Sequence, residues 1–284
     1  MQNQAIKYKA QFYIEELKAL FYFDTPLDTS FSISTDSRNI EKEQILFLDV
    51  ETVPLYKDYT SIPENKKKFW DHKSKLLAKL EQEDYERLIP EEKNKLYERA
   101  GIFSEFGKII CISSGFLKSV NGNTELQVKS IYNHDERTVL SLFLDILKKL
   151  EQGSQKWFLC AHNGKEFDFP YLCRRMVVNG LPIPGILDLA GKKPWEVFHL
   201  DTMELWKFGD YKSYASLDLL ADIFNIPSPK DDLDGSKVRQ VYYEDNNLER
   251  IAEYCSKDVI TLAQVLMRYK GEPFILAENI KMVP

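Results

Sequence analysis

The stretch Gln44-Ile45-Leu46-Phe47-Leu48-Asp49-Val50-Glu51-Thr52-Val53-Pro54 combines a short apolar run with two carboxylates near its end. The apolar, β-favouring residues predict a strand that is buried on both faces. Because successive side chains of a strand alternate between faces, Asp49 and Glu51 project to the same side, about 7 Å apart along the chain. Pro54 cannot continue a central strand, so the strand ends just past the acids.

Two carboxylates on one face at the end of a buried strand repel each other, and a divalent metal ion is the simplest compensating charge. The alternative is an exposed acidic strand end before a turn. Asp-x-Glu is common by chance, so the rest of the chain has to decide between these two interpretations.

The chain has 284 residues, of which 44% are hydrophobic and 29% charged, as in ordinary globular proteins. No apolar run approaches the roughly 18 residues that a membrane helix needs, and the N-terminus lacks the layout of a secretory signal. We therefore expect a cytoplasmic protein with no membrane partner. With a net charge of −6, any polyanionic partner would need a local basic patch or a bound metal.

The four cysteines are scattered and show no Cys-x-x-Cys spacing. We interpret them as small buried thiols in a reducing compartment, and not as zinc ligands or disulfides. They are Cys111, Cys160, Cys173 and Cys255.

Residues 1–43 are expected to form an N-terminal extension, and residues 44–284 one domain with a helical insert at 56–104. Within this insert, residues 64–79 carry six lysines against two acidic residues, and the following residues 81–92 are strongly acidic. The basic block fits a phosphate-tracking surface with an aromatic side chain for base stacking. It also fits a solvated helix whose Trp70 is buried in the core, and we favour the buried position for Trp70.

The remaining periodicities predict strands and helices in alternation, which indicates a mixed α/β sheet with helices on both faces. The Asn121-Gly122-Asn123 turn predicts that the second and third strands form a hairpin. Further strands are expected at 108–116, 125–132, 156–161 and 197–200, and helices at 135–150, 166–179, 213–224 and 247–269.

Two further positions supply acids. Asp168 follows an apolar strand and the Asn163-Gly164 turn and opens the next helix, although capping and the helix dipole also favour an acid there. Tyr254 and Asp258 stand four residues apart and share one face of a long amphipathic helix. The alternative for this pair is an inward-packed tyrosine with an aspartate on the helix flank.

All three positions lie where an open α/β sheet places ligands, at strand ends and on the helices packed against them. Four carboxylates that converge there would hold two divalent cations about 3.5–4 Å apart. Oxygen ligands suit Mg²⁺ or Mn²⁺, and no His/Cys set competes for them. Two such ions support phosphoryl displacement, and a tyrosine hydroxyl can orient the attacking water.

On these residues the sequence resembles the DEDDy-type 3′–5′ exonucleases of the ribonuclease H-like superfamily, and within them the predicted exonucleases related to the proofreading domain of family B DNA polymerases. A histidine-type member would have His where this chain has Glu253, so the tyrosine branch is favoured. The resemblance runs from about Leu46 to Tyr269. Its three motifs are Asp49 and Glu51, then Asn163, Phe167 and Asp168, then Tyr254 and Asp258.

The resemblance implies a mixed sheet of about five strands, the first three antiparallel, flanked by helices and with a helical insert after the first strand. It implies that Asp49 bridges two metal ions, that Glu51 and Asp258 complete the shell of the first ion, and that Asp168 holds the second partly through water. Tyr254 would position the nucleophilic water.

The implied substrate contacts are Asn163, Phe167 and the backbone at Thr52 and Val53. The implied activity is hydrolysis from the 3′ end of single-stranded DNA or RNA, with DNA favoured, releasing nucleoside 5′-monophosphates. Because the chain ends at Pro284 with no polymerase region, we expect no proofreading in cis.

Two other classes of function stay open. A catalytically silent nucleic-acid-binding module on the same fold would have lost a carboxylate, and none is lost. A phosphoesterase acting on short oligonucleotides would have a closed pocket with little basic surface leading to it, and the acidic net charge is compatible with that.

Overall fold

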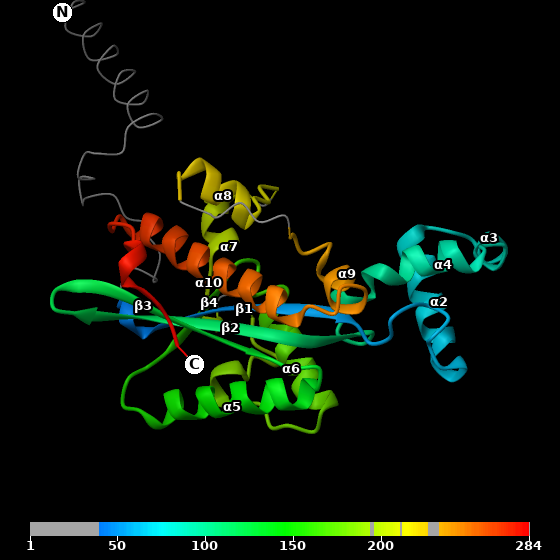
Figure 1. The fold of residues 1–284 in the computed structure, drawn as a ribbon, viewed down its shortest axis with the longest axis horizontal. Helices are drawn as coiled ribbons and strands as arrows, with labels where there is room; N and C mark the ends of the chain where they lie inside the picture. Colours follow the sequence, from blue (N-terminus) through cyan, green and yellow to red (C-terminus); the bar gives the residue numbers. More distant parts are fainter. Residues whose placement is uncertain (1–39, 194–195, 211, 227–232, 284) are drawn as a thin grey trace, which may run out of the picture.

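The computed structural model describes residues 40–193, 196–210, 212–226 and 233–283. The expected N-terminal extension at 1–43 therefore lies almost entirely outside the described residues. Within them, a six-stranded sheet with the order β5-β4-β1-β2-β3-β6 forms the centre of the fold (Figure 1). Its strands are β1 (Ile45–Pro54), β2 (Gly107–Val120), β3 (Asn123–Tyr132), β4 (Phe158–Ala161), β5 (Leu200–Asp201) and β6 (Ile280–Met282).

The strand directions agree with the predicted mixed sheet. β1 pairs antiparallel with β2, and β2 with β3, so the first three strands are antiparallel as expected. The pairs β1/β4, β4/β5 and β3/β6 are parallel. The expected number of about five strands omitted β6, because the alternation of Ile280, Lys281 and Met282 is too short to indicate a strand.

Helices cover both faces of the sheet, as the alternation of strands and helices predicts (Figure 1). One face is covered by α10 (Leu248–Lys270) and α8 (Leu217–Ile223), with α7 (Thr202–Lys207) and α9 (Val238–Tyr243) beside α10. The other face is covered by α5 (Glu136–Gln152) and α6 (Asp168–Val178). Short 3-10 helices are η2 (Lys42–Gln44), η4 (Gly185–Leu187) and η6 (Ala277–Asn279).

The two faces of β1 contact two separate parts of the core. Ile45 and Phe47 pack in the cluster that contains α10, whereas Leu46, Leu48 and Val50 pack in the cluster that contains α5 and α6. This alternation is that of a strand buried on both sides. By the same alternation, the side chains of Asp49 and Glu51 point to the face of the sheet that α10 covers.

Between β1 and β2 the chain forms a helical lobe, residues 55–106, which lies beyond the end of the sheet (Figure 1). Pro54 pairs with Gly107, so the chain leaves the sheet and returns to it at paired positions of neighbouring strands. The Leu55 N–H donates to the Phe106 carbonyl at 2.8 Å and closes this neck. The lobe contains α2 (Glu64–Ala78), α3 (Gln82–Glu86), α4 (Pro90–Tyr97) and η3 (Glu98–Ile102).

The lobe has a small aromatic core of its own. Trp70 on α2 is 1% exposed, and its ring meets Tyr97 and Phe106 edge to face at centroid distances of 5.2 and 5.1 Å. The favoured buried position of Trp70 is therefore confirmed. Its neighbour Phe69, by contrast, is 59% exposed.

No helix among the described residues combines the length and apolar character needed to cross a bilayer.

A buried histidine, His199, joins β4 to the 3-10 helix η4. The Leu159 N–H donates to His199 Nδ1 at 3.1 Å, so the proton of the neutral ring sits on Nε2, which donates to the Ile186 carbonyl at 2.7 Å. Burial lowers the pKa of His199 to about 4.

Protonation of His199 should destabilise the fold in acid. The unfolded chain takes up the proton below pH 6.5 and the folded chain only near pH 4, so stability falls across this window by about 3 kcal/mol. Urea unfolding of wild type and His199→Gln between pH 7 and pH 4 measures the effect, because glutamine keeps an acceptor and a donor but does not titrate. Equal pH dependence of the two proteins would contradict this assignment.

Candidate active site

Two of the predicted acids lie together on the α10 side of β1. Carboxylate oxygens of Asp49 and Glu51 and the thiol of Cys255 all lie within 4.8 Å of one another. Glu51 is buried, and Asp49 Oδ2 is buried with no hydrogen-bond partner among the described residues. Cys255 donates its thiol proton to the Asp49 carbonyl at 3.4 Å. The sequence interpretation had treated Cys255 only as a buried thiol.

Helix α10 brings Tyr254 and Asp258 to the same place. Cys255 and Val259 on this helix are fully buried against the sheet, which turns the neighbouring positions toward β1. The Tyr254 hydroxyl hydrogen-bonds to Asp258, and both residues interact electrostatically with Glu51. Glu253, at the position that would distinguish the histidine branch, is exposed.

Asp168 reaches the cluster from the opposite layer, at the first residue of α6. Its carboxylate is buried and hydrogen-bonds to the main chain of Val50, which lies between the two acids of β1. The turn before it requires glycine: a Cβ on Gly164 would lie 2.3 Å from the Cβ of Ala161. Asn163 has a left-handed φ of 61°, a conformation that asparagine tolerates better than most residues.

Asp201, at the end of β5, holds this turn in place. Its carboxylate accepts from the N–H groups of Asn163 at 2.9 Å and Lys165 at 3.0 Å. It also caps α7 by accepting from Met203 and Glu204. Sequence reasoning missed this role. The available signal was an Asp followed by Thr at the start of a short helix, which indicates a helix cap but not its second partner.

Burial and mutual repulsion raise the pKa of Asp49, Glu51 and Asp168. The pKa of Asp49 rises to about 7 through burial and the charge of Asp168, and that of Asp168 to about 8, also first through burial. The pKa of Glu51 is raised well above its ordinary value by burial and then by Asp49 and Asp258. Burial and the three nearby acids Asp258, Glu51 and Asp49 also raise the pKa of the Tyr254 hydroxyl, which therefore keeps its proton.

This environment fits a hard divalent cation. The buried carboxylates repel one another, and Asp49 Oδ2 has no hydrogen-bond partner in the part of the chain that the structure describes. A bound cation would offset this repulsion. Burial raises the pKa of the Cys255 thiol well above its ordinary value, and the thiol donates its proton to the Asp49 carbonyl, so the hard ligands offered here are carboxylate oxygens. The donor set is therefore made of oxygens, which suits Mg²⁺ or Mn²⁺.

The residues predicted to contact substrate differ in how far their side chains are exposed to solvent. Asn163 and Phe167 are partly exposed beside the α6 N-terminus, and Phe167 stacks obliquely on Tyr171 with ring centroids 5.2 Å apart. Thr52 is half-buried. The Val53 side chain is fully buried against α9 and α10, so only its backbone is available to a ligand.

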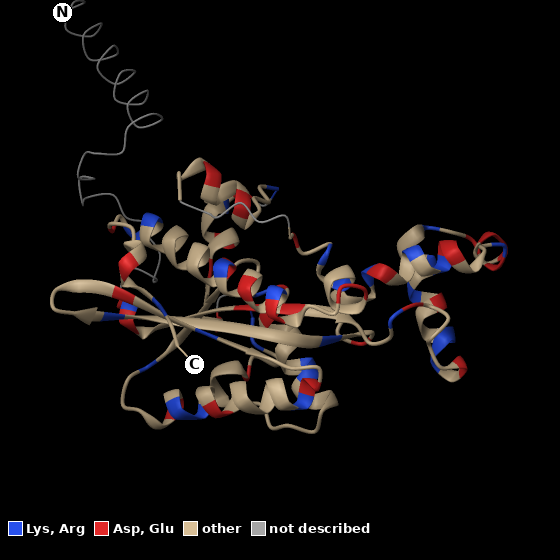
Figure 2. Cartoon of the chain, in the orientation of Figure 1, with Lys and Arg blue, Asp and Glu red and all other residues tan. Residues whose placement is uncertain are grey.

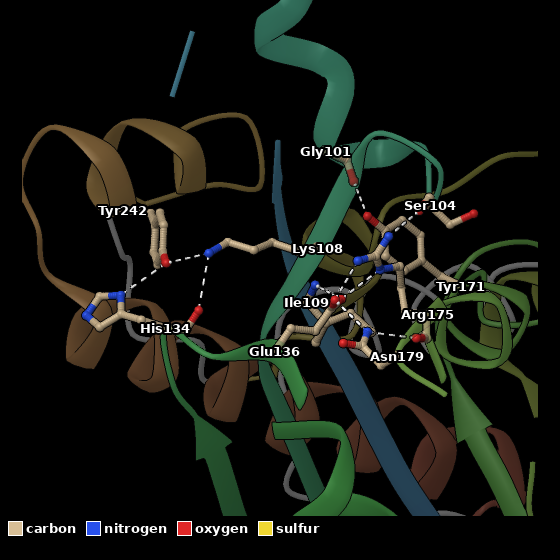
Figure 3. Close-up of polar contacts among 10 residues, drawn as sticks. All are labelled: Gly101, Ser104, Lys108, Ile109, His134, Glu136, Tyr171, Arg175, Asn179 and Tyr242. Carbon is tan, nitrogen blue, oxygen red and sulfur yellow. Dashed lines mark hydrogen bonds and ion pairs between the residues drawn. The ribbon is translucent and has the colours of Figure 1, made fainter. Parts of the chain in front are cut away.

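A buried ion pair fixes α6 with respect to the sheet and the helical lobe (Figure 3). Arg175 on α6 donates from Nε and Nη2 to the two oxygens of Glu136 on α5, at 2.8 and 2.5 Å. Its Nη1 donates to the Ser104 carbonyl of the lobe at 2.8 Å, and the Ile109 N–H of β2 donates to Glu136 at 2.7 Å. Both charges are satisfied, which is the condition for a favourable buried pair.

Tyr171, one turn before Arg175, makes a second connection to the lobe (Figure 3). Its hydroxyl donates to the Gly101 carbonyl at 2.7 Å. A Cβ on Gly107 would lie 2.3 Å from this hydroxyl, so only glycine fits at the start of β2. The helix that begins with Asp168 is therefore fixed to the lobe at two successive turns.

Comparison with known proteins places the chain in a family. Residues 102–272, more than half of the chain, match a family described as predicted 3′–5′ exonucleases related to the exonuclease domain of PolB. The chain belongs to this family, and the resemblance noted in the sequence is confirmed at that level. The matched region contains Asp168, Tyr254 and Asp258 and begins after β1.

Among solved structures, the chain is similar to the family B DNA polymerase of the hyperthermophilic archaeon Pyrobaculum calidifontis. The similarity has 17% sequence identity and a TM-score of 0.44, and it covers 78% of this chain and 24% of that chain. The chain thus corresponds to about a quarter of the polymerase. Among curated proteins no significant match was found.

Replacing Arg175 by methionine should lower the free energy of unfolding by about 3–5 kcal/mol, because Glu136 would remain as a buried charge without its partner. The free energy of unfolding should fall less in the double variant Glu136→Gln/Arg175→Met than in Arg175→Met, because no unpaired charge is then buried. Urea denaturation measures both changes, and Arg174→Met, at the exposed neighbouring position on α6, is the matched control. A single Arg175→Met variant as stable as the control would show that the pair does not fix α6.

Proposed function

We propose that the protein is a metal-dependent 3′–5′ exonuclease that hydrolyses phosphodiester bonds at the 3′ end of single-stranded nucleic acid. The observation that carries the proposal is the buried, partnerless Asp49 oxygen at the centre of converging acids in a member of this exonuclease family. We infer that DNA is preferred to RNA and that nucleoside 5′-monophosphates are released.

The acids have distinct roles in this proposal. Asp49 would be shared by two cations, with Glu51 and Asp258 on the first and Asp168 on the second. When bound, the two ions supply an activated water and neutralise charge on the attacking and leaving oxygens. Tyr254, whose hydroxyl keeps its proton, acts as a hydrogen-bonding group that orients the attacking water, and not as a base.

Substrate would approach over the α6 N-terminus. A cavity of about 1060 Å³ adjoins this turn, and its lining includes Asn163, Lys165, Arg174, Lys192 and Asp201. Its volume is of the size that binds small ligands. Its lining carries four basic and five acidic side chains, with Lys165 paired to Glu204, and it includes none of the four proposed metal ligands. Asn163, Phe167 and the backbone at positions 52 and 53 are the proposed contacts to the terminal nucleotides.

We also keep residues 44–284 as the proposed exonuclease domain, with 56–104 as its insert. A reducing cytoplasm is the proposed location. It is supported by four cysteines that are all free thiols in the structure.

Asp49→Asn should lower exonuclease activity by at least about 10²-fold, because it removes the negative ligand proposed to be shared by both ions. The assay follows shortening of a 5′-labelled oligonucleotide from its 3′ end with Mg²⁺ or Mn²⁺. Asp145→Asn, at an exposed position on α5, is the control and should keep wild-type activity. Equal activity of Asp49→Asn and the control would refute the proposed site.

Tyr254→Phe should lower kcat by about 10-fold or more and leave the half-saturating Mg²⁺ concentration unchanged, because the hydroxyl orients water and does not hold an ion. Steady-state kinetics at several Mg²⁺ concentrations separates the two effects. The matched control is Tyr132→Phe, at an exposed position on β3. A change confined to Mg²⁺ affinity would contradict this role.

A further inference from the structure

The outer face of α2 in the helical lobe carries an exposed aromatic stripe. With 3.6 residues per turn, Asn65, Phe69, His72 and Leu76 form one stripe along α2, about 100–160° round the helix from the buried Trp70. All four side chains are exposed, with Phe69 at 59% and Leu76 at 60%. Phe69 and Leu76 therefore lie on one exposed side of the helix, about two turns apart.

Lysines lie along one side of this stripe. Lys68 neighbours Phe69 on α2, and Lys79 is the exposed C-cap residue of the helix. Lys66 and Lys73 instead contact aromatic side chains of the lobe: Lys66 Nζ donates to the Tyr56 hydroxyl at 3.2 Å, and Lys73 Nζ lies 4.4 Å from the centre of the Phe103 ring. Lys68 Nζ lies 5.1 Å from the centre of the Phe69 ring. Neither Lys68 nor Lys79 has a carboxylate within salt-bridge distance in the described part of the chain. The α2 outer face is the set of six exposed residues Asn65, Lys68, Phe69, His72, Leu76 and Lys79.

Charge separates α2 from the rest of the lobe. The α2 segment carries five lysines and two acidic residues, whereas α3 carries three acidic residues and no basic one (Figure 2). The chain as a whole has a net charge of −6, so the α2 outer face is a local basic patch on an acidic protein. Such a patch is the electrostatic footprint expected for a polyanion.

We propose that the α2 outer face binds single-stranded nucleic acid some nucleotides away from its 3′ end, while that end occupies the active site. The lysines would neutralise successive phosphates, and Phe69 would stack on a base. This inference rests on the proposed exonuclease function, because it assigns the second contact of the same substrate. It accounts for the placement of an exposed phenylalanine beside lysines, which a solvated helix face does not require.

The lobe is joined rigidly to the active site, so a strand held on α2 has a fixed position relative to the acids. β1 continues from Glu51 directly into the lobe neck, where Tyr243 of α9 donates to the Pro54 carbonyl at 2.7 Å. Tyr171 and Arg175 fix the other end of the lobe to α6, whose first residue is Asp168. Both sides of the catalytic cluster are therefore connected to the helix that carries the basic patch.

The decisive variant is Lys68→Gln/Phe69→Ala/Lys79→Gln, tested by fluorescence anisotropy with a labelled single-stranded 24-mer in EDTA, where no hydrolysis occurs. We expect at least about 10-fold weaker binding. The slope of log K against log salt should fall by about 1.4, or about 0.7 for each lost lysine. Phe69→Tyr should bind as wild type, because it keeps the stacking ring.

The matched control is Leu142→Ala/Lys148→Gln/Lys149→Gln on α5, where the three side chains are also exposed. It should bind as wild type. Hydrolysis of a trinucleotide, which occupies only the active site, should keep its kcat/KM in both triple variants, whereas KM for the 24-mer should rise about 10-fold in the α2 variant alone.

Unchanged 24-mer binding by the α2 variant would overturn the inference and leave the face to a protein partner. An equal loss in the α5 control would overturn it as well, since the effect would then be net charge. Because binding is measured without hydrolysis, a wild type that binds through α2 but cleaves no oligonucleotide would refute only the exonuclease proposal. If the wild type is an active exonuclease but the α2 variant binds the 24-mer as tightly as wild type does, only this inference is refuted.

Discussion

Mutual repulsion among buried carboxylates is the constraint on which the rest of the structure depends. Asp49, Glu51 and Asp168 approach one another away from water, and each negative charge makes the next harder to ionise. Ionisation of such a cluster opposes folding, because burial removes the charges from water and each charge repels the next. The surrounding fold must therefore hold the acids in position by interactions of its own.

A different kind of interaction fixes each acid. β1 is paired with β2 on one side and β4 on the other, which sets the first two acids. The buried stripe of α10 against the sheet sets Asp258. Asp168 depends on the Arg175–Glu136 pair and on Asp201, which binds the preceding turn through main-chain N–H groups. Polar contacts, and not only apolar packing, thus determine the shape of the site.

Local periodicity predicted the parts of this arrangement that depend on one element. The two-residue period of β1 placed Asp49 and Glu51 on one face, and the helix expected at 247–269 is found at Leu248–Lys270 behind an Asn247 cap. Contacts between distant segments were not predictable in this way. Asp201 accepts a hydrogen bond from the Asn163 N–H, and Cys255 donates one to the Asp49 carbonyl. Both contacts depend on how β5 and α10 pack in the fold, which no local sequence pattern encodes. The catalytic roles of the site residues stay predictions.

The neck of the helical lobe has an evolutionary consequence. Because Pro54 and Gly107 face each other across an antiparallel pair, the intervening chain returns to the point where it left, as a hairpin turn would. Relatives could therefore lengthen, shorten or exchange this module without shifting the register of β1, and with it the acids. Selection could then change what the module contacts independently of the chemistry at the end of the sheet.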